Sequence, residues 1–327
     1  MLYPLKFNPI FKEKIWGGEK IGSFLGKDFS PLSNCGETWE ISAVEGNVSV
    51  VSEGPLKGTE LSEIIKHHTS ELLGQSVYDA FGTDFPLLIK FIDAKEDLSI
   101  QVHPNDELAQ QRHNCFGKSE MWYIFQADEG ASLISGFSKK VDKESYLEAF
   151  NNGKLEDILC RTEVQAGDVF NIPAGRVHTI GAGILLAEIQ QTSDITYRIY
   201  DFDRKDKEGN LRELHVEEAL DAISYEYQES YKTSYETVKN SLSPVVSSPY
   251  FETNKFLIDE EIIRDYDELD SFVIYICYKG KAIINSRGYT TEMKKGDALL
   301  IPANLDLISI EPLEETEFLE TYIPEVE

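Results

Sequence analysis

The fold of this chain is limited most by the segment 164–178, which reads VQAGDVFNIPAGRVH. Gly167-Asp168 and Pro173-Ala-Gly175 each favour a tight turn, because glycine accepts backbone angles that other residues avoid and proline fixes φ. The short apolar runs beside these turns predict strands. His178 follows the second turn directly. The segment therefore predicts a strand–turn–strand–turn unit within a mainly β protein, with a histidine presented at its end.

The same turn pattern occurs a second time near the C-terminus. Gly296-Asp297 is followed by Pro302 at the spacing found in the first copy, which indicates a repeated β unit. Leu307 stands at the position that corresponds to His178. The second unit is therefore expected to keep the fold and to lack the potential ligand.

The length and the residue pattern together predict two domains. A chain of 327 residues, 41% of them hydrophobic, exceeds what one small core usually organises. Short strands predominate, and helical spacing occurs in three segments: 59–78, 142–160 and 213–223. A polar connector over 225–248 precedes a final run of short strands. We therefore expect a β domain with a small helical insertion over residues 1–240, and a degenerate β domain over 241–327.

The charge and the composition exclude several classes of partner. The 31 basic and 58 acidic residues give a formal charge of −27, which repels nucleic-acid phosphates, and no basic stripe offsets it. No apolar run approaches the ~18 residues of a membrane span. The four cysteines form no CxxC pair, which is typical of free thiols in a reducing compartment. We expect a cytoplasmic protein with a small-molecule substrate, and the sequence leaves its oligomeric state open.

Four side chains form a candidate metal site. Gln101 and His103 are two residues apart on a predicted strand, so they project from the same face. Glu120 begins an aromatic strand, and His178 follows the turn described above. Two imidazoles, a carboxylate and an amide oxygen suit Zn²⁺ with open positions for substrate. They suit Fe²⁺ or Mn²⁺ as well, so the ligand types alone do not select zinc.

Several further motifs occur in a fixed order: Ile15-Trp-Gly-Gly18, Glu37-Thr-Trp-Glu40, Pro86-Leu-Leu-Ile-Lys-Phe-Ile92, Leu98-Ser-Ile-Gln-Val-His-Pro-Asn-Asp106, Gly117-Lys-Ser-Glu-Met-Trp-Tyr123 and Gln191-Thr-Ser-Asp-Ile-Thr-Tyr-Arg-Ile-Tyr-Asp201. Over residues 1 to about 225 the chain thereby resembles the type I phosphomannose isomerases in their shorter bacterial form. The resemblance implies two cupin-type jelly-roll β-barrels and interconversion of mannose 6-phosphate and fructose 6-phosphate. It also implies one zinc ion per chain, with these ligands: Gln101, His103, Glu120 and His178.

The resemblance also assigns residues to the reaction. It implies that Arg198 and Lys118 are catalytic and that Asp194 lies at the substrate, and we expect Trp16 to line the same pocket. A permanently charged Arg198 would stabilise an enediolate or clamp the phosphate. The isomerisation also needs a base, for which Lys118, Asp194 and a zinc-bound water are the candidates.

Two other functions share these ligand types. A metal-dependent cupin dioxygenase uses the same donors, but the pair of Lys118 and Arg198 suits an anionic polyol phosphate better than an aromatic substrate. A non-enzymatic sugar-binding cupin would be expected to have lost its ligands. The C-terminal unit shows that loss, and the N-terminal unit does not.

Overall fold

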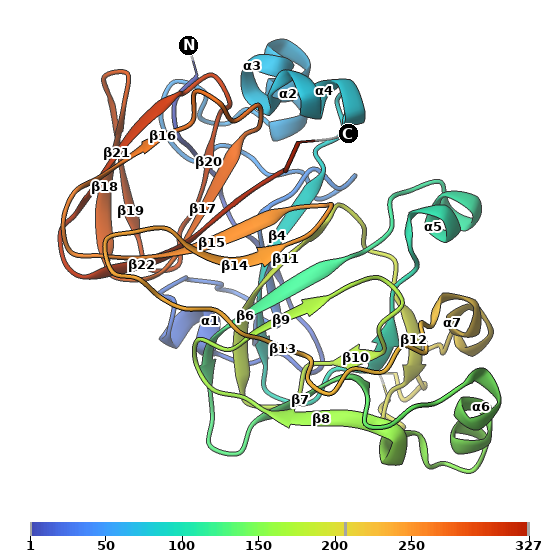
Figure 1. Cartoon of the computed structure of the whole chain (residues 1–327). Coiled ribbons are helices and arrows are strands. Elements are labelled where there is room, and N and C mark those ends of the chain that lie inside the picture. The colour runs from blue at the N-terminus through green and yellow to red at the C-terminus, as the bar shows by residue number, and fades with distance from the viewer. Residues whose placement is uncertain (1, 206–207, 326–327) are drawn as a thin grey trace.

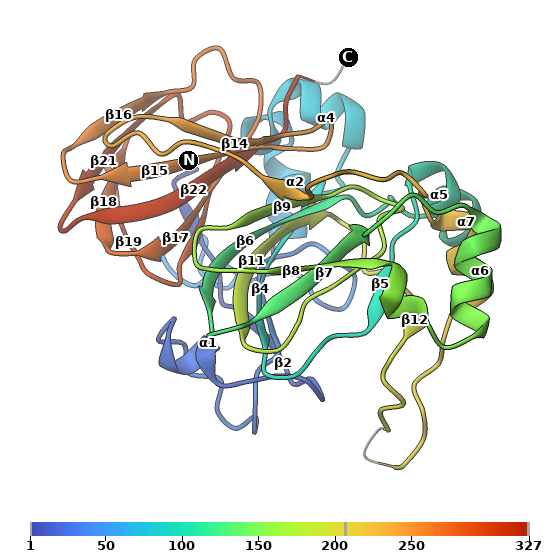
Figure 2. The same ribbon diagram turned by 60° about the horizontal axis from the view of Figure 1, so that its bottom comes forward.

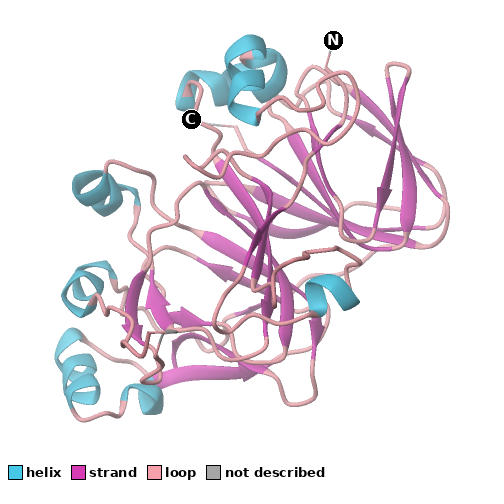
Figure 3. Cartoon of the chain, turned by 180° about the vertical axis from the view of Figure 1, so that it is seen from behind, coloured by secondary structure: helices cyan, strands magenta, loops and turns pink. Residues whose placement is uncertain are grey.

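The computed structural model describes residues 2–205 and 208–325, whose course is shown in Figure 1. Within these residues the strands form four antiparallel sheets, arranged as two units of two facing sheets each. The helices lie around the periphery (Figure 3). The predicted mainly β class is confirmed. In place of closed barrels, however, the described strands form facing sheets whose edge strands are not joined to each other.

The N-terminal unit has a larger and a smaller sheet. The larger sheet has the order β13 (Lys232–Thr233), β9 (Val169–Ile172), β6 (Glu120–Ala127), β11 (Ile184–Gln191), β4 (Leu87–Ala94), β3 (Glu37–Ile41) and β2 (Ile10–Lys12). The smaller sheet has the order β12 (Tyr197–Tyr200), β5 (Ile100–Val102), β10 (His178–Thr179), β7 (Ser132–Phe137) and β8 (Leu159–Glu163). Alternate apolar side chains from both inner faces, including Trp122 and Leu133, form one core between the sheets.

Helices cover the outer face of the smaller sheet. They are α6 (Lys143–Asn151), the 3-10 helix η1 (Leu155–Ile158) and α7 (Val216–Ala222), and they share a core with that face. Figure 2 shows α6 and α7 lying together at this side. The helices predicted within 142–160 and 213–223 are thus confirmed. Two other short helices, α1 (Lys20–Ser23) and α5 (Asp106–His113), lie in connections. None of the described helices is long and apolar enough to cross a membrane.

The helical segment predicted over 59–78 is confirmed, but it is divided into three helices. These are α2 (Leu61–His68), α3 (Ser70–Leu73) and α4 (Gln75–Phe81). The breaks fall at Thr69 and Gly74, whose φ angles are 40° and 93°. Gly74 also packs against the backbone of the C-terminal unit, because a Cβ there would lie 2.3 Å from the Asp270 carbonyl oxygen. This contact holds the helices against the C-terminal unit.

The C-terminal unit has the same two-sheet design. One sheet has the order β1 (Leu5–Lys6), β20 (Ala298–Ile301), β17 (Val273–Lys279), β22 (Thr316–Tyr322), β15 (Glu252–Ile258) and β14 (Ser243–Ser247). The other has the order β16 (Ile262–Asp265), β21 (Leu307–Pro312), β18 (Lys281–Ser286) and β19 (Tyr289–Lys294). The large sheets of the two units share an extended apolar core. We propose a domain boundary near residue 240. The strand β1, close to the start of the chain, nevertheless belongs to a sheet of the C-terminal unit, where it pairs with β20.

The internal repeat predicted from the turn motifs is present in the structure. Gly167 N donates to Ile124 O at 2.8 Å, and Gly296 N donates to Cys277 O at 2.8 Å. Both glycines have positive φ, 88° and 91°, which only glycine adopts without strain. The turns lead into β9 and β20, which pair with β6 and β17 in the same manner.

The repeat shows what the second unit has lost. Glu120 pairs with Ile172 on β9, and Val273 pairs with Ile301 at the corresponding place on β20. Leu307, at the position of His178, is 56% exposed. Two of the potential ligands are therefore replaced by apolar residues, and the second unit retains the fold without the site.

A buried ion pair stabilises the C-terminal unit. Glu320 is fully buried, and both its oxygens accept hydrogen bonds from Arg264, at 3.0 Å each. The Tyr266 hydroxyl donates to the same carboxylate. We expect Arg264→Ala to lower the free energy of unfolding by about 3 kcal/mol, because it leaves a buried charge without its cation. Urea unfolding followed by circular dichroism measures this change.

An exposed ion pair in the same unit provides the matched control. Arg287 pairs with Asp306 at 2.8 Å, and about half of each side chain is exposed. Arg287→Ala is therefore expected to change the stability by about 0.5 kcal/mol or less. Equal small effects of the two variants would contradict the role given to Arg264.

Candidate metal centre and substrate cavity

The structure brings three of the predicted ligands together at one end of the N-terminal unit. His103 follows β5, Glu120 begins β6 and His178 begins β10. One potential ligand atom from each lies within 4.8 Å of the others, and all three side chains are buried. His103 Nε2 and His178 Nε2 lie 3.5 and 3.6 Å from the two oxygens of Glu120. A donor set this compact is a potential metal-binding triad.

Local backbone contacts explain why the ligand-bearing segments converge. Gly175 N donates to His103 O at 2.9 Å, so the turn before His178 is tied to the end of β5. Gly175 has a φ of 87°, and a Cβ there would lie 2.9 Å from the Ala222 carbonyl oxygen. Glycine is therefore required at this turn, as the sequence motif indicated.

The two histidines are oriented by backbone carbonyl groups. His103 Nδ1 lies 3.1 Å from Ile195 O, and His178 Nδ1 lies 2.8 Å from Arg176 O. Because a carbonyl oxygen only accepts, each Nδ1 carries the proton and each Nε2 presents its lone pair to the cluster. Burial lowers the pKa of His103 well below its usual value and that of His178 to about 4. Both rings are therefore neutral near pH 7, the state in which imidazole binds metal ions.

Glu120 is the residue that most needs an additional partner. It is fully buried, and neither oxygen has a hydrogen bond of good geometry. Burial, and secondly the charge of Glu188, raise its pKa to about 7. A buried carboxylate without hydrogen bonds is costly even with the Lys118 ammonium 3.2 Å from one of its oxygens, and a divalent cation between Glu120 and the two imidazoles would satisfy it. The residues present therefore fit a metal ion.

Gln101 and Lys118 complete the immediate surroundings of the triad. Gln101 Nε2 lies 3.2 Å from His178 Nε2, and a half-turn of the amide would present its oxygen instead. Lys118 Nζ lies 3.2 Å from both His103 Nε2 and Glu120 Oε2. Lys118 precedes β6, which begins only at Glu120, and its side chain nevertheless reaches the triad.

A cavity of about 350 Å³ opens beside the triad. It is lined by all of the residues predicted for substrate or catalysis, together with one predicted ligand: Trp16, Lys118, Asp194, Arg198 and Gln101. Among the described residues that line it, the basic ones outnumber the acidic ones: Lys14, Lys90, Lys118, Arg198 and Arg212 against Glu37, Glu188 and Asp194. An otherwise acidic protein thus has a locally basic cavity, which favours an anionic ligand.

Arg198 is held by the backbone and has no acidic partner within ion-pair distance among the described residues. Its Nη1 donates to Glu213 O at 2.7 Å, and its buried Nε has no partner. Arg212 lines the same cavity and forms two hydrogen bonds with Asp201, at 2.7 and 2.8 Å. Burial, and secondly the charge of Arg212, lower the pKa of Arg198. This arrangement differs from the surface ion pairs common for arginine and leaves donors available to an anion.

The sequence-based prediction missed a buried pair on the wall of the cavity. Lys90 Nζ lies 3.0 Å from Glu188 Oε1 and donates to Gln190 Oε1 at 2.6 Å. Trp122 Nε1 donates to the other oxygen of Glu188 at 3.0 Å. Burial opposes ionisation, yet Lys90 and then Lys118 lower the pKa of Glu188 to about 2. The signal was a charged residue flanked by apolar residues in the middle of each of two strands.

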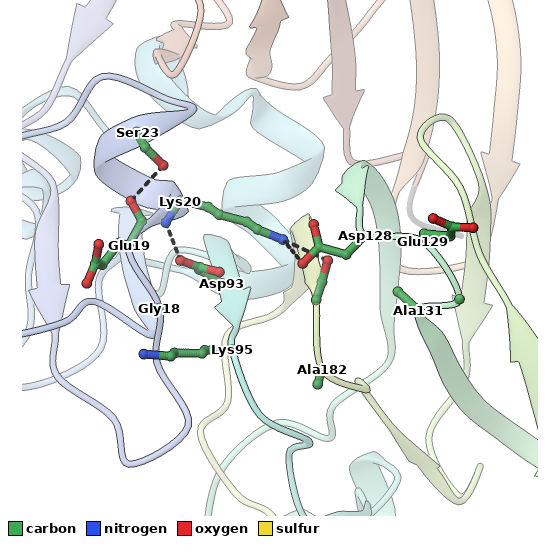
Figure 4. Close-up of a pocket in the computed structure, with 12 residues that line it drawn as sticks. Gly18, Glu19, Lys20, Ser23, Asp93, Lys95, Asp128, Glu129, Ala131 and Ala182 are labelled. Atoms are coloured by element: carbon green, nitrogen blue, oxygen red, sulfur yellow. Dashed lines mark hydrogen bonds and ion pairs between the residues drawn. The ribbon is translucent and has the colours of Figure 1, made fainter.

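A second cavity, of about 510 Å³, lies beside α1 and is shown in Figure 4. Three of its charged groups are bonded to one another: Lys20 Nζ lies 2.8 Å from Asp128, and Lys20 N donates to Asp93 at 2.5 Å. None of the predicted site residues lines it. We therefore take the smaller cavity, next to the triad, as the candidate substrate site.

Comparisons with known proteins support this assignment. The family model "Phosphomannose isomerase type I, catalytic domain" matches residues 4–129. The mannose-6-phosphate isomerase ManA of Bacillus subtilis is 38% identical over 311 residues, covering 94% of this chain and 96% of that protein. The mannose-6-phosphate isomerase of Streptococcus mutans is 37% identical and covers 92% and 93%.

Solved structures agree with the sequence comparisons. The mannose 6-phosphate isomerase from Bacillus subtilis superposes with a TM-score of 0.87 at 34% identity, over 98% of this chain and 99% of that one. A putative mannosephosphate isomerase from Archaeoglobus fulgidus, at 22% identity and a TM-score of 0.79, shares the fold. The fold and the site define a cupin-like protein with a potential metal-binding triad. The chain belongs to the type I phosphomannose isomerase family.

Proposed function

We propose that this protein is an aldose–ketose isomerase that interconverts mannose 6-phosphate and fructose 6-phosphate. The observation that carries the proposal is the Glu120 carboxylate, buried without hydrogen-bond partners between two neutral imidazoles, at a basic cavity. Membership of the family supports the same activity. Neither a metal-dependent dioxygenase nor a non-enzymatic sugar-binding cupin is supported by the comparisons.

We further propose that the resident metal is zinc, one ion per chain. Its ligands would be His103, Glu120, His178 and Gln101, a donor set of the kind found in catalytic zinc sites. When bound, the ion supplies Lewis-acid stabilisation of charge on the substrate oxygens. The free state of all four cysteines is in keeping with a cytoplasmic enzyme, which we propose as well.

The side chains of the cavity have separate tasks in this proposal. The isomerisation transfers a proton between C2 and C1 of the open-chain sugar through an enediol. Lys118 and Asp194 are the side chains proposed to accept and return that proton, since both line the cavity. Arg198 stabilises negative charge, either on the enediolate or on the phosphate. Trp16 closes one wall, packed into the core while lining the cavity, and excludes water.

Metal removal tests the proposal directly. A coupled assay follows fructose 6-phosphate formed from mannose 6-phosphate by purified protein, alongside elemental analysis. We expect about one zinc per chain and chelator-sensitive turnover that returns when zinc is added back. Free mannose is the matched control substrate, and it should react poorly because it lacks the anion that the basic cavity favours.

Two results would contradict the proposal. Full turnover after complete removal of metal would exclude the metal site from the reaction. A metal-loaded protein without turnover would exclude the isomerase activity while leaving the site intact.

A further inference from the structure

The segment 117–119 carries Lys118 into the site, and its backbone is held at every residue. Gly117 N donates to Asp106 Oδ1 at 2.8 Å, and Ser119 N donates to Gln191 Oε1 at 2.9 Å. Between them, Lys118 N donates to Pro104 O at 3.1 Å. Three consecutive amide groups outside a strand are thus bonded to two other segments of the chain, residues 104–106 and the end of β11 at Gln191. We call this segment the lysine arm.

Asp106 and Gln191 are also bonded to each other, so they form one bracket around the lysine arm. Gln191 Nε2 donates to Asp106 Oδ1 at 3.0 Å, while Gln191 N donates to Ser119 O at 3.1 Å. Gln191 is only 6% exposed. The arm lies so close to the start of α5 that a Cβ on Gly117 would be 2.5 Å from Asp106 N. The bracket therefore leaves the arm no room to shift on that side.

The bracket connects to two other parts of the molecule. Ser119 Oγ accepts from Ala174 N at 3.2 Å, in the turn that leads to His178. Tyr250, from the C-terminal unit, lies beside Asp106: burial, and secondly that carboxylate, raise the pKa of Tyr250. The second unit, whose described residues contain no group of potential metal ligands, thus reaches the segment that presents Lys118.

We propose that Gln191 and Asp106 are positioning residues for the isomerisation, which hold the lysine arm so that Lys118 faces the metal ligands. The inference rests on the proposed function. A lysine side chain has four rotatable bonds, so a fixed backbone narrows the range of positions open to Lys118 Nζ, which lies 3.2 Å from both His103 Nε2 and Glu120 Oε2. A displacement of about 1 Å in a reacting group can cost ~100-fold in rate. Gln191 and Asp106 themselves do not line the cavity.

The first test replaces Gln191 by leucine, which keeps the approximate volume and removes both side-chain hydrogen bonds. We expect kcat for mannose 6-phosphate to fall ~30- to 100-fold while KM changes less than ~3-fold, with the metal content unchanged. Thr192→Val is the matched control. It removes a side-chain hydrogen bond to Phe85 O from the next residue and leaves the lysine arm untouched.

The second test compares two substitutions of Asp106. Asp106→Ala removes the oxygen that accepts hydrogen bonds from Gly117 N and Gln191 Nε2, and it should lower kcat. Asp106→Asn retains an oxygen acceptor and should keep most of the wild-type kcat.

A double variant tests whether the bracket acts through Lys118. The double variant Lys118→Met with Gln191→Leu should have a kcat only slightly below that of Lys118→Met alone. The effects of substitutions in residues that act as one unit are not additive.

The outcomes separate this inference from the proposed function. Absence of turnover in the wild-type protein would contradict the proposed function, independently of the kinetic parameters of the variants. A wild-type protein that turns over, with Gln191→Leu equal to Thr192→Val, would overturn the positioning role alone. Additive losses in the double variant, or loss of metal from Gln191→Leu, would show a merely structural contact and would also overturn it.

Discussion

Replacing His178 by alanine is expected to abolish isomerisation and to lower the metal content of the purified protein. His178 is fully buried, and its Nε2 faces Glu120 at 3.6 Å while Nδ1 is occupied by a backbone carbonyl. Its removal deletes one of two imidazoles and leaves Glu120 buried beside a void. The rate should fall by ~10³-fold or more, because the remaining donors cannot retain a catalytic ion.

The measurement combines elemental analysis with the coupled assay on the same preparation. His67→Ala is the matched control, because His67 lies on the exposed side of α2 and bonds only to the helix backbone among the described contacts. Circular dichroism and thermal unfolding show whether His178→Ala is folded. A folded, metal-free variant with normal turnover would exclude this site from the reaction.

Replacing Arg198 by alanine is expected to leave the metal content unchanged and to lower kcat/KM by ~10²- to 10³-fold. Arg198 lines the cavity without belonging to the triad, and no described carboxylate neutralises it within ion-pair distance. Its charge is therefore available to the substrate. Arg198→Lys retains the charge and loses the planar set of donors, so an intermediate rate is expected.

The kinetic parameters distinguish the two tasks that Arg198 could perform. A phosphate clamp binds the ground state and the transition state alike, so its loss raises KM; stabilisation of an enediolate acts only in the transition state, so its loss lowers kcat. Arg161→Ala is the control, since Arg161 forms an exposed pair with Glu156. Unchanged kcat and KM in Arg198→Ala would remove this arginine from the mechanism.

Much of the site could be predicted because its features are local in sequence. Gln101 and His103 share a face since side chains alternate along a strand, and the turn at Gly175 places His178 at the start of the next one. The same reasoning predicted the second unit, where Gly296 repeats the turn at Gly167.

Other features could not be predicted from local pattern. The pairing of Lys90 with Glu188 joins residues 98 positions apart, and it depends on the register between β4 and β11. Arg212 enters the cavity from a connection whose course no periodicity describes. The bracket formed by Asp106 and Gln191 likewise joins two motifs that the sequence separates by 85 positions.

The sequence by itself determined which side chains are potential ligands, the turns that present them, the mainly β class and the absence of the corresponding potential ligands from the second unit. These depend on backbone preferences and side-chain alternation, which act between neighbouring residues. Only the tertiary structure decided that Glu120 is buried without a hydrogen bond, that Arg198 has no described carboxylate within ion-pair distance, and that β1 belongs to the C-terminal sheet. Burial and strand register arise from packing between distant segments, so they appear only when the chain is folded.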